Sequence, residues 1–329
     1  MTRRGLILFI LLGVAWGIPY LLIKIAVGEL SPAMLVFSRT ALAAVVLLPV
    51  AAARGELSPA LRRWRPLLAY TLAEIIVPQF LLGSAEQRLP SSTTGLLIAA
   101  VPLAGVGVAF LLGQPERLTP GNWLGIALGM TGVATLAGFA VAGADLGAAG
   151  QVLVVVVCYA LGPAILAKWV PGLPATGVTA IGVTVSAVVY GPVVALTHGW
   201  PSAWPSPSVL ASVAVLGVVC SAAALTMMAA LVAEAGPVRA TAVTYVNPAV
   251  ALAAGAIVLG EPVTGWSLAG FALILAGCCF VAVHGRADDP AGADGRRAGT
   301  AAARPARAGP APALPAAVLP APASQDCVS

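Results

Sequence analysis

Long apolar runs separated by short loops constrain this chain more than any other feature. A membrane-crossing helix needs about 20 predominantly apolar residues, and runs of that length recur up to about residue 285. A soluble domain cannot hide the apolar surface of a chain that is 60% hydrophobic and 9% charged. We therefore predict an all-α membrane protein with ten transmembrane helices. The expected segments are 6–27, 33–53, 66–85, 91–113, 121–140, 150–170, 176–197, 208–231, 237–259 and 265–284.

Positive charge predicts how these segments are oriented. Ten crossings put both termini on one side of the membrane, and Lys and Arg favour cytoplasmic loops. With the N-terminus inside, the outer loops keep only Arg88, whereas Arg3, Arg4 and the arginines of the C-terminal tail are cytoplasmic. We expect a multi-pass protein of the plasma (inner) membrane with both termini in the cytoplasm.

Two apolar stretches with a central proline suggest that one unit is used twice. Ser91–Glu116 contains Pro102, and Pro237–Pro262 contains Pro248, about 146 positions later. Both stretches end near a glutamate. A membrane chain that is built twice, with broken helices at matching places, is typical of secondary transporters.

The repeat predicts how the chain is divided. Residues 1–140 and 150–285 hold five expected spans each. Because five is odd, the second repeat runs inverted relative to the first. Residues 286–329 are rich in Ala, Pro and Arg and lack aromatics, so we expect a disordered cytoplasmic tail.

Several function classes lack their sequence signals. The sequence contains no Walker motif, which would predict nucleotide binding, and no Cys/His spacing that would predict a metal site. Basic residues are not interleaved with aromatics, so no nucleic-acid partner is expected. No cofactor and no catalytic residue are implied. The expected partners are a small-molecule substrate and the lipid bilayer, and the sequence leaves the oligomeric state open.

Glu74 and Arg39 are ionisable residues well inside expected spans, where a charge is costly. Glu74, near the centre of the third span, is suited to bind a proton or a substrate amine, or to brace a neighbouring helix. Tyr70, Thr71 and Pro78 share its face by helical spacing. Arg39, about six residues inside the second span, is suited to bind a carboxylate, to pair with Glu74 or to stabilise helix packing. Proton coupling and plain facilitated diffusion both stay open.

Polar stripes and prolines complete the candidate substrate path. Intramembrane polar faces turn toward a cavity or a partner helix, and proline removes a backbone donor and leaves a carbonyl one turn earlier unpaired. The alternative for each residue is a helix–helix seam or a passive kink. The candidates besides Arg39 and Glu74 are Trp16, Tyr20, Pro102, Thr241, Thr244, Tyr245, Asn247 and Pro248. Lys24 and Lys168 are expected to extend toward the membrane surfaces.

With these motifs the chain resembles the EamA family of the drug/metabolite transporter superfamily, over about residues 5–285. The order and repetition of the motifs carry the resemblance, although Gly113–Glu116 reads Gly-Gln-Pro-Glu where the family usually has Gly-Glu. The further motif residues are Gly13–Lys24, Ser31-Pro32, Arg39, Pro102, Glu116–Thr119, Gly125–Gly132, Ala235–Pro237, Asn247-Pro248, Gly260–Pro262 and Gly270–Gly277.

The resemblance implies a ten-helix inverted repeat that exports small metabolites, often amino acids or drugs. A secondary active transporter working by alternating access is the favoured hypothesis. A facilitative channel, a membrane-embedded enzyme and a non-transporting scaffold are the alternatives.

Overall fold

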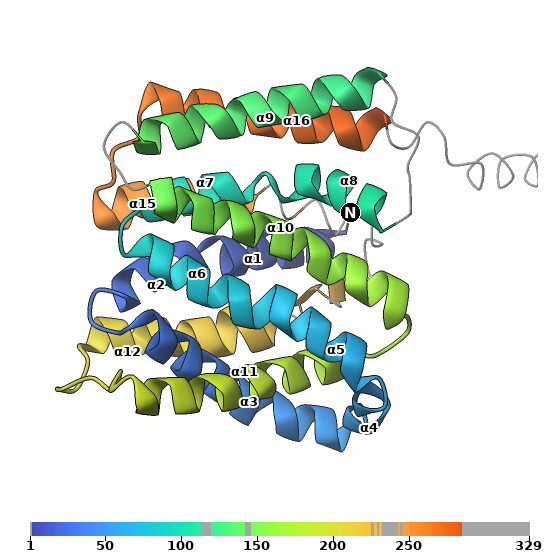
Figure 1. Cartoon of the computed structure of the whole chain (residues 1–329), viewed down its shortest axis with the longest axis vertical. Helices are drawn as coiled ribbons and strands as arrows, with labels where there is room; N and C mark the ends of the chain where they lie inside the picture. Colours follow the sequence, from blue (N-terminus) through green and yellow to red (C-terminus); the bar gives the residue numbers. More distant parts are fainter. Residues whose placement is uncertain are drawn as a thin grey trace, which may run out of the picture. The chain divides into compact units, whose positions relative to one another are not determined.

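The computed structural model describes residues 2–112, 120–141, 146–224, 227–228, 230–231, 243 and 246–284. Every regular element among them is helical, and they all belong to one compact unit, Met1–Ala287 (Figure 1). The expected tail, 286–329, lies outside the described residues. The elements are α1 Arg3–Gly17, α2 Pro19–Ala26, α3 Pro32–Ala53, α4 Leu57–Leu61, α5 Trp64–Thr71, η1 Leu72–Ile76, α6 Val77–Glu86, α7 Ser91–Ile98, α8 Val101–Leu111, α9 Pro120–Val141, α10 Leu146–Trp169, α11 Ala175–Leu196, α12 Pro207–Ala214, η2 Val215–Ala223, α15 Asn247–Leu259 and α16 Gly265–His284.

Each expected segment contains an apolar helix. Six helical stretches among the described residues are long and apolar enough to cross a membrane, and four more are apolar but shorter. The six are Arg3–Ala26, Pro32–Ala53, Trp64–Glu86, Ser91–Val108, Leu146–Trp169 and Ala175–Leu196. The prediction of a multi-pass all-α membrane protein is thereby confirmed, whereas the number of crossings stays a prediction.

Large apolar side chains face outward from the described helices. Ile257 and Leu196 are 83% and 82% exposed, and Phe110, Val45 and Val188 are exposed as well. Such side chains are costly in water when they are this numerous, but they match a hydrocarbon surrounding. The outer surface of the bundle therefore fits contact with lipid.

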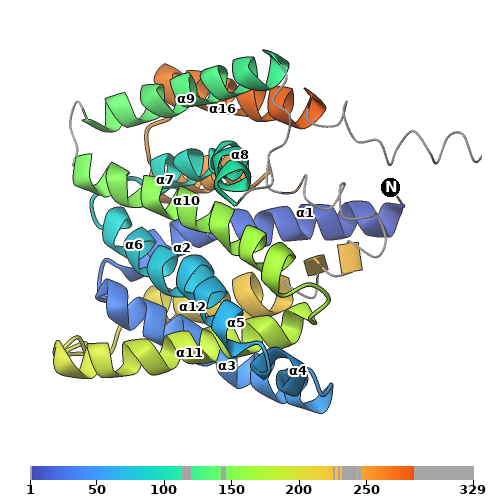
Figure 2. The same cartoon turned by 45° about the vertical axis from the view of Figure 1, so that its right-hand side comes forward.

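Two helix pairs form the two edges of the described helical bundle. α9 packs along α16 and α3 packs along α11, and Figure 2 shows the two pairs at opposite edges. Glycines allow α9 and α16 to come close: a Cβ on Gly277 would lie 2.5 Å from the Gly125 carbonyl oxygen and 2.6 Å from the Gly129 nitrogen. Small residues are the usual means of close helix approach in a membrane.

The packing partners repeat when the two halves of the chain are exchanged. α1 packs on α15, and α10, which occupies the corresponding place in the second half, packs on α8. In the same way α2 packs on α12 whereas α10 packs on α6, and α3 packs on η2 whereas α11 packs on α5 and η1. The third span of each half thus contacts the first span of the other half.

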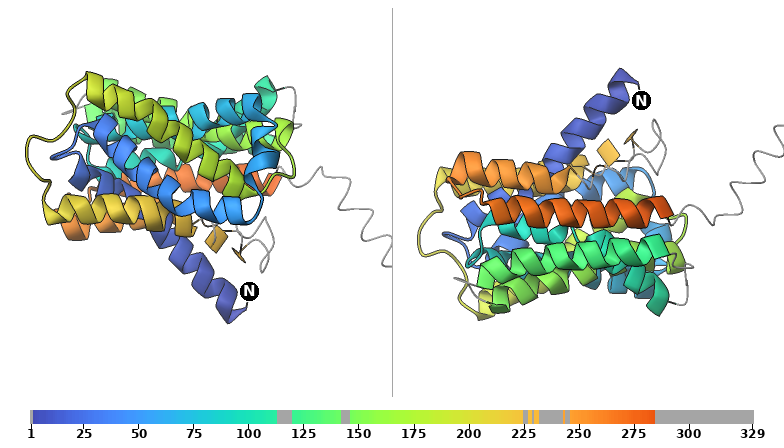
Figure 3. Two further views of the ribbon diagram at one scale, coloured as in Figure 1. Left: turned by 90° about the horizontal axis from the view of Figure 1, so that it is seen from below. Right: turned by 90° about the horizontal axis from the view of Figure 1, so that it is seen from above.

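Several spans are irregular near their middles. α1 ends at Gly17 and α2 begins at Pro19, and Figure 3 shows the N-terminal part of α1 projecting beyond the other described helices. α7 ends at Ile98 and α8 begins at Val101, with Pro102 in its first turn. The third span of each half contains a π-helical stretch, η1 and η2. π-helical turns appear mostly as single-turn insertions inside α-helices, frequently at functional sites.

Glu261 connects the two halves at one end of the bundle. Gly260 ends α15 in a left-handed conformation with φ of 66°, which glycine adopts readily. The Glu261 carboxylate then accepts hydrogen bonds from the backbone N–H groups of Ser91 and Ser92, at 2.8 and 2.9 Å, at the start of α7. Burial alone would raise the pKa of Glu261, but the hydrogen bonds from Ser92 and Ser91 outweigh it and lower the pKa. The Gly-Glu-Pro motif therefore caps a helix of the other half.

Two further glutamates of the first half cap helices of the second. Glu29 accepts a hydrogen bond from the Ser206 N–H, at 2.8 Å, just before α12. Glu56 accepts one from the Gly177 N–H, at 3.1 Å, in the first turn of α11. Helix N-termini carry unpaired donors and a partial positive charge, which a carboxylate satisfies. Side chains of each half thus complete helices of the other.

Candidate functional site

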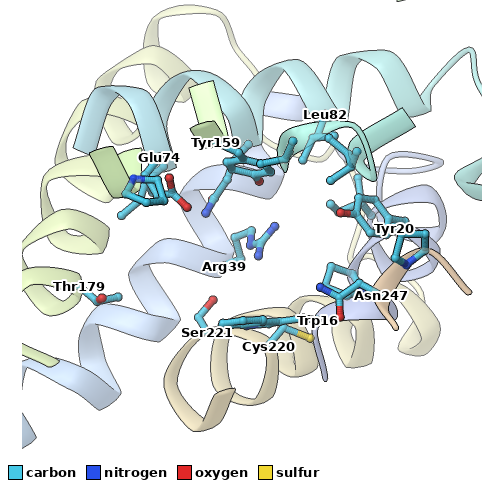
Figure 4. Close-up of a pocket in the computed structure, with 18 of the residues that line it drawn as sticks. Trp16, Tyr20, Arg39, Glu74, Leu82, Tyr159, Thr179, Cys220, Ser221 and Asn247 are labelled. Atoms are coloured by element: carbon cyan, nitrogen blue, oxygen red, sulfur yellow. The ribbon is translucent and has the colours of Figure 1, made fainter. Parts of the chain in front are cut away.

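A cavity of about 480 Å³ lies among the helices and is lined by both halves of the chain (Figure 4). Helices from the first four spans of each half contribute to its wall, whereas none of the described side chains of α9 and α16 is among the lining residues. The lining residues are Trp16, Pro19, Tyr20, Ile23, Arg39, Tyr70, Glu74, Ile75, Gln79, Leu82, Ile98, Ala99, Val101, Pro102, Tyr159, Pro163, Thr179, Val183, Cys220, Ser221, Asn247 and Pro248.

The structure brings most of the expected path residues together around this cavity. Three expected residues, Thr241, Thr244 and Tyr245, lie outside the described residues. The expected residues that line the cavity are Trp16, Tyr20, Arg39, Glu74, Pro102, Asn247 and Pro248. Six separate elements or their links supply them, so their proximity follows from the tertiary fold.

Glu74 lies in the π-helical stretch η1, on the cavity wall. Its carboxylate packs against α10 where Gly162 leaves room, because a Cβ at that position would overlap it. Atom Oε2 is buried and has no hydrogen-bond partner among the described residues. An unpaired buried carboxylate oxygen is costly, so this atom is available to a proton or to a ligand that donates hydrogen bonds.

The expected helical face around Glu74 was only partly right. Tyr70 lines the cavity, but Thr71 is fully buried and donates to the Leu67 carbonyl, and Pro78 is not a lining residue. Gln79 faces the cavity instead. A π-helical turn bonds residue i to i+5, so it shifts the face that α-helical spacing predicts by one residue.

Arg39 reaches the cavity from α3 and is 8% exposed. Its Nε atom is buried without a hydrogen-bond partner among the described residues. The hypothesis that Arg39 pairs with Glu74 is not borne out here, since the structure gives no ion pair between these two described side chains. Figure 4 shows the guanidinium inside the ring of labelled residues, between Tyr159 and Asn247. The cavity thus presents a separate cation and a separate carboxylate.

Aromatic and amide groups form much of the remaining wall. Trp16, Tyr20, Tyr70 and Tyr159 line the cavity, and ring faces attract cations. Asn247 lies at the start of α15, and its Oδ1 atom is buried without a partner in the described part of the chain. Apolar rings with a few unsatisfied polar atoms are the usual composition of a small-molecule site.

Both expected proline breaks lie at the cavity. Pro102 follows the interruption between α7 and α8, where Ile98 and Ala99 also line the wall. Pro248 lies in the first turn of α15. Discontinuous helices place backbone polar groups at the midplane sites of transporters. The two prolines are therefore at positions where a broken helix meets the cavity.

Several lining residues were missed by the reasoning from sequence. Gln79 was hidden by the π-helical shift, and Tyr159 and Thr179, in the sixth and seventh spans, were not singled out. Cys220 and Ser221 are adjacent in η2, and the Ser221 hydroxyl donates to the Leu216 carbonyl at 2.9 Å. A polar pair inside an apolar run was the available signal.

The two span-end lysines donate to backbone carbonyl oxygens at the ends of neighbouring helices, and their extension toward the membrane surfaces stays a prediction. Lys24 Nζ donates to the Glu86 and Leu89 carbonyl oxygens, at 2.6 and 2.8 Å. Lys168 Nζ donates to the Leu112 carbonyl oxygen at 2.8 Å. Carbonyls at a helix C-terminus lack intrahelical donors, and an ammonium group satisfies them. These lysines therefore complete neighbouring helix ends.

The described residues offer no group of three or more His, Cys, Asp or Glu side chains that could hold a metal ion. What the arrangement can do chemically is bind. The cavity offers a small polar molecule a cation, a carboxylate and aromatic rings as binding partners. It sits between two halves whose packing partners correspond.

Comparison with known proteins gives the context for this cavity. The chain is 29% identical over 254 residues to a protein of Escherichia coli K12 described as the uncharacterized inner membrane transporter YedA, covering 75% of this chain and 80% of that protein. It is 26% identical over 303 residues to the uncharacterized transporter YvbV of Bacillus subtilis strain 168, covering 88% and 95%.

A solved crystal structure, described only as that of a protein, is 22% identical and superposes with a TM-score of 0.60, covering 87% of this chain and 99% of its own. This likeness concerns the fold alone. The model of the EamA-like transporter family matches two stretches of the chain, residues 3–138 and 147–283. These two matches cover most of the sequence, and the chain therefore belongs to the EamA-like transporter family.

Proposed function

We propose that this protein is a secondary active transporter that exports small metabolites, amino acids or related compounds and drugs, across the inner membrane. The observation that carries the proposal is the cavity, where Arg39 Nε and Glu74 Oε2 are buried atoms without a hydrogen-bond partner among the described residues. A transporter site must bind its substrate reversibly near the middle of the membrane. Unsatisfied groups of opposite charge provide the binding energy for that step.

The same two groups suggest how a substrate is oriented. A zwitterionic molecule places its carboxylate at Arg39 and its ammonium at Glu74, with the aromatic rings around the ammonium. The expected residues Thr241, Thr244 and Tyr245 belong to this proposed path as well. The cavity carries one cation and one carboxylate among its lining residues, which favours a substrate with little net charge.

The proposed mechanism is alternating access between two inverted five-helix repeats. Residues 1–140 and 150–285 form these repeats in ten crossings, with both termini in the cytoplasm. The exchange symmetry of the packing partners and the π-helical stretches in both third spans support this arrangement. The cavity lies between the halves, so rocking one half against the other exposes it to each side in turn.

Counterflow in proteoliposomes tests the function. A growth screen for resistance to toxic amino acids and drugs on overexpression selects the probe, and its radiolabelled form is then exchanged across the vesicle membrane. In a carrier, the unlabelled compound that leaves the vesicles drives transient accumulation of the labelled compound, whereas a channel gives no such accumulation. Absence of counterflow for every compound that confers resistance would contradict the proposal.

Two variants test the site. Glu74→Gln and Arg39→Ala each remove one charged contact, and a lost charged hydrogen bond weakens binding by about tenfold or more. Arg54→Ala is the control, because Arg54 caps the same helix α3 at its far end and lies outside the cavity. Unchanged transport in both cavity variants would remove Arg39 and Glu74 from the site.

A further inference from the structure

Glu86, the last residue of α6, is a carboxylic acid that the cavity does not use. Its side chain is 0% exposed, and neither Oε1 nor Oε2 has a hydrogen-bond partner among the described residues. An ionised carboxylate in such surroundings is strongly disfavoured, whereas the neutral acid is tolerated. The geometry described here is therefore that of a protonated Glu86.

A cation lies next to this carboxyl but is engaged elsewhere. Lys24 Nζ donates to the backbone carbonyl of Glu86 itself, at 2.6 Å, and to that of Leu89, at 2.8 Å. Lys24 also interacts electrostatically with the Glu86 carboxyl, and an ammonium group within reach of a charged carboxylate binds it. Its use as a donor to two carbonyls fits a neutral acid.

The other titratable groups around Glu86 come from several elements. Lys24 of α2, Arg39 of α3 and Glu261 after α15 act on its carboxyl electrostatically, as do the hydroxyls of Tyr20 and Tyr159 on α2 and α10. The sequence of α7, the remaining neighbour of α6, contains no titratable side chain. Glu74 belongs to η1, which precedes α6 in the same span, and its carboxyl faces the cavity.

These neighbours connect Glu86 to the site and to the end of the bundle. Tyr20, Arg39 and Tyr159 line the cavity, and so does Leu82, one turn before Glu86. On the other side, the residues after Glu86 lead into α7, whose N-terminus is held by Glu261 from the second half. A change of charge at Glu86 therefore acts electrostatically on the cavity and on the start of α7.

We propose that Glu86 is a proton-binding site, and that release of its proton draws the Lys24 ammonium from the Glu86 and Leu89 carbonyls to the carboxylate. The carbonyls at the end of α6 then lose their donor, and the link from α6 to α7 is loosened. This inference rests on the proposed function, because it supplies the transporter with a place to couple proton movement to opening at this end.

Infrared difference spectroscopy of the full-length protein in lipid vesicles tests the proposal without any substrate. Between about pH 5 and about pH 9, a range over which shifted carboxyl groups titrate, the wild type should show the carbonyl band of a neutral carboxylic acid that disappears as pH rises. Glu86→Gln should lose this band. Glu56→Gln and Glu74→Gln should retain it, because Glu56 accepts a hydrogen bond at a helix end and Glu74 belongs to the cavity.

A second variant protects the test against misfolding. Glu86→Asp keeps a carboxyl, so the band should persist at a shifted frequency. A band that is identical in Glu86→Gln or Glu86→Asp and in the wild type, or the lack of any such band in the wild type, would overturn the inference. Neither infrared result would contradict the proposed transport function, which the counterflow experiment tests. Conversely, missing counterflow would contradict the transport function but not the infrared assignment of Glu86.

Discussion

Contact between the Glu74 carboxylate and the α10 backbone at Gly162 makes the glycine part of the site. Glycine is needed there because any side chain would occupy the space of the carboxylate. Glu74 therefore depends on a residue of the other half for its position. Adding one methyl group at position 162 is the smallest change that moves the Glu74 carboxylate without removing it.

We expect Gly162→Ala to displace the Glu74 carboxylate and to raise the KM for substrate by about tenfold, because an oriented charged contact is lost. Gly150→Ala is the control, since it lies on the same helix and a Cβ there meets nothing within 4 Å. Counterflow at several substrate concentrations measures both. An unchanged KM in Gly162→Ala would show that the position of Glu74 does not matter for binding.

For single residues, the sequence predicted which side chains belong to the candidate site better than it predicted what surrounds them. Polar and ionisable groups inside apolar runs identified Arg39, Glu74 and Asn247, because only a cavity or a partner makes such groups tolerable in a membrane. Glu86 was missed, because the expected third span ended one residue before it. Its burial depends on Lys24 and on the link to α7, which only the tertiary structure reveals.

Capping of α7 by Glu261 is the clearest link between one element and a residue distant in sequence. The hydrogen bonds from Ser91 and Ser92 lower the pKa of Glu261 despite its burial. A carboxyl whose pKa is lower in the folded protein contributes stability above its unfolded pKa, and the contribution is lost as pH falls through the folded pKa. The link is therefore a stabilising contact at neutral pH that weakens in acid.

Glu261→Gln should lower the free energy of unfolding at pH 7 by about 1–2 kcal/mol, the usual cost of losing a helix cap. The loss should shrink as the pH falls through the lowered pKa of folded Glu261, because the wild-type carboxyl then becomes neutral as well. Thermal unfolding in detergent at a series of pH values measures this. A difference between variant and wild type that does not depend on pH would contradict the assignment of the charge.

The pair formed by α9 and α16 has a packing role that is separate from the cavity. Gly277→Ala places a methyl group against the backbone of Gly125 and Gly129, and such overpacking costs about 1–3 kcal/mol. We expect a lower melting temperature with an unchanged KM, because neither helix lines the cavity. Gly265→Ala, at the open start of α16, is the control. A changed KM would mean that the pair also positions the site.

Helix boundaries followed from apolar length and from proline, but helix type did not. The break at Pro102 was visible because proline lacks an N–H. Nothing in the sequence of Leu72–Ile76 marks a π-helical stretch. There the Tyr190 hydroxyl donates to the Ile76 carbonyl at 2.9 Å, so a contact from α11, 114 positions away in sequence, contributes to the local hydrogen bonding.

For the molecule in its membrane, the charge asymmetry and the order of spans give a prediction about sides. In a variant without native cysteines, Ser202→Cys should react with a membrane-impermeant maleimide in intact cells. Ser58→Cys should react only after permeabilisation. Both serines are exposed, and the two loops face opposite sides if the N-terminus is cytoplasmic. Labelling of both sites in intact cells would contradict the orientation.

Fold class and family followed from the sequence because they depend on apolar length, loop spacing and repeated motifs. The presence of a cavity could be predicted but its wall could not, since the wall combines residues from eight expected spans. Equivalent places in the two halves also carry different chemistry. Glu74 lies in η1, whereas Cys220 and Ser221 lie in η2. One sequence therefore shows that the scaffold is doubled, whereas the chemical difference between the two halves at the cavity wall is apparent only in the three-dimensional structure.

Carboxylates that reach from each half to the helix starts of the other imply something for how the protein is made. If the chain were divided between two genes, each product alone would expose uncapped helix ends and would be open to proteolysis. Joint synthesis would restore Glu29, Glu56 and Glu261 to their partners. The two products should accumulate only when they are synthesised together, as obligate companions rather than as self-sufficient modules.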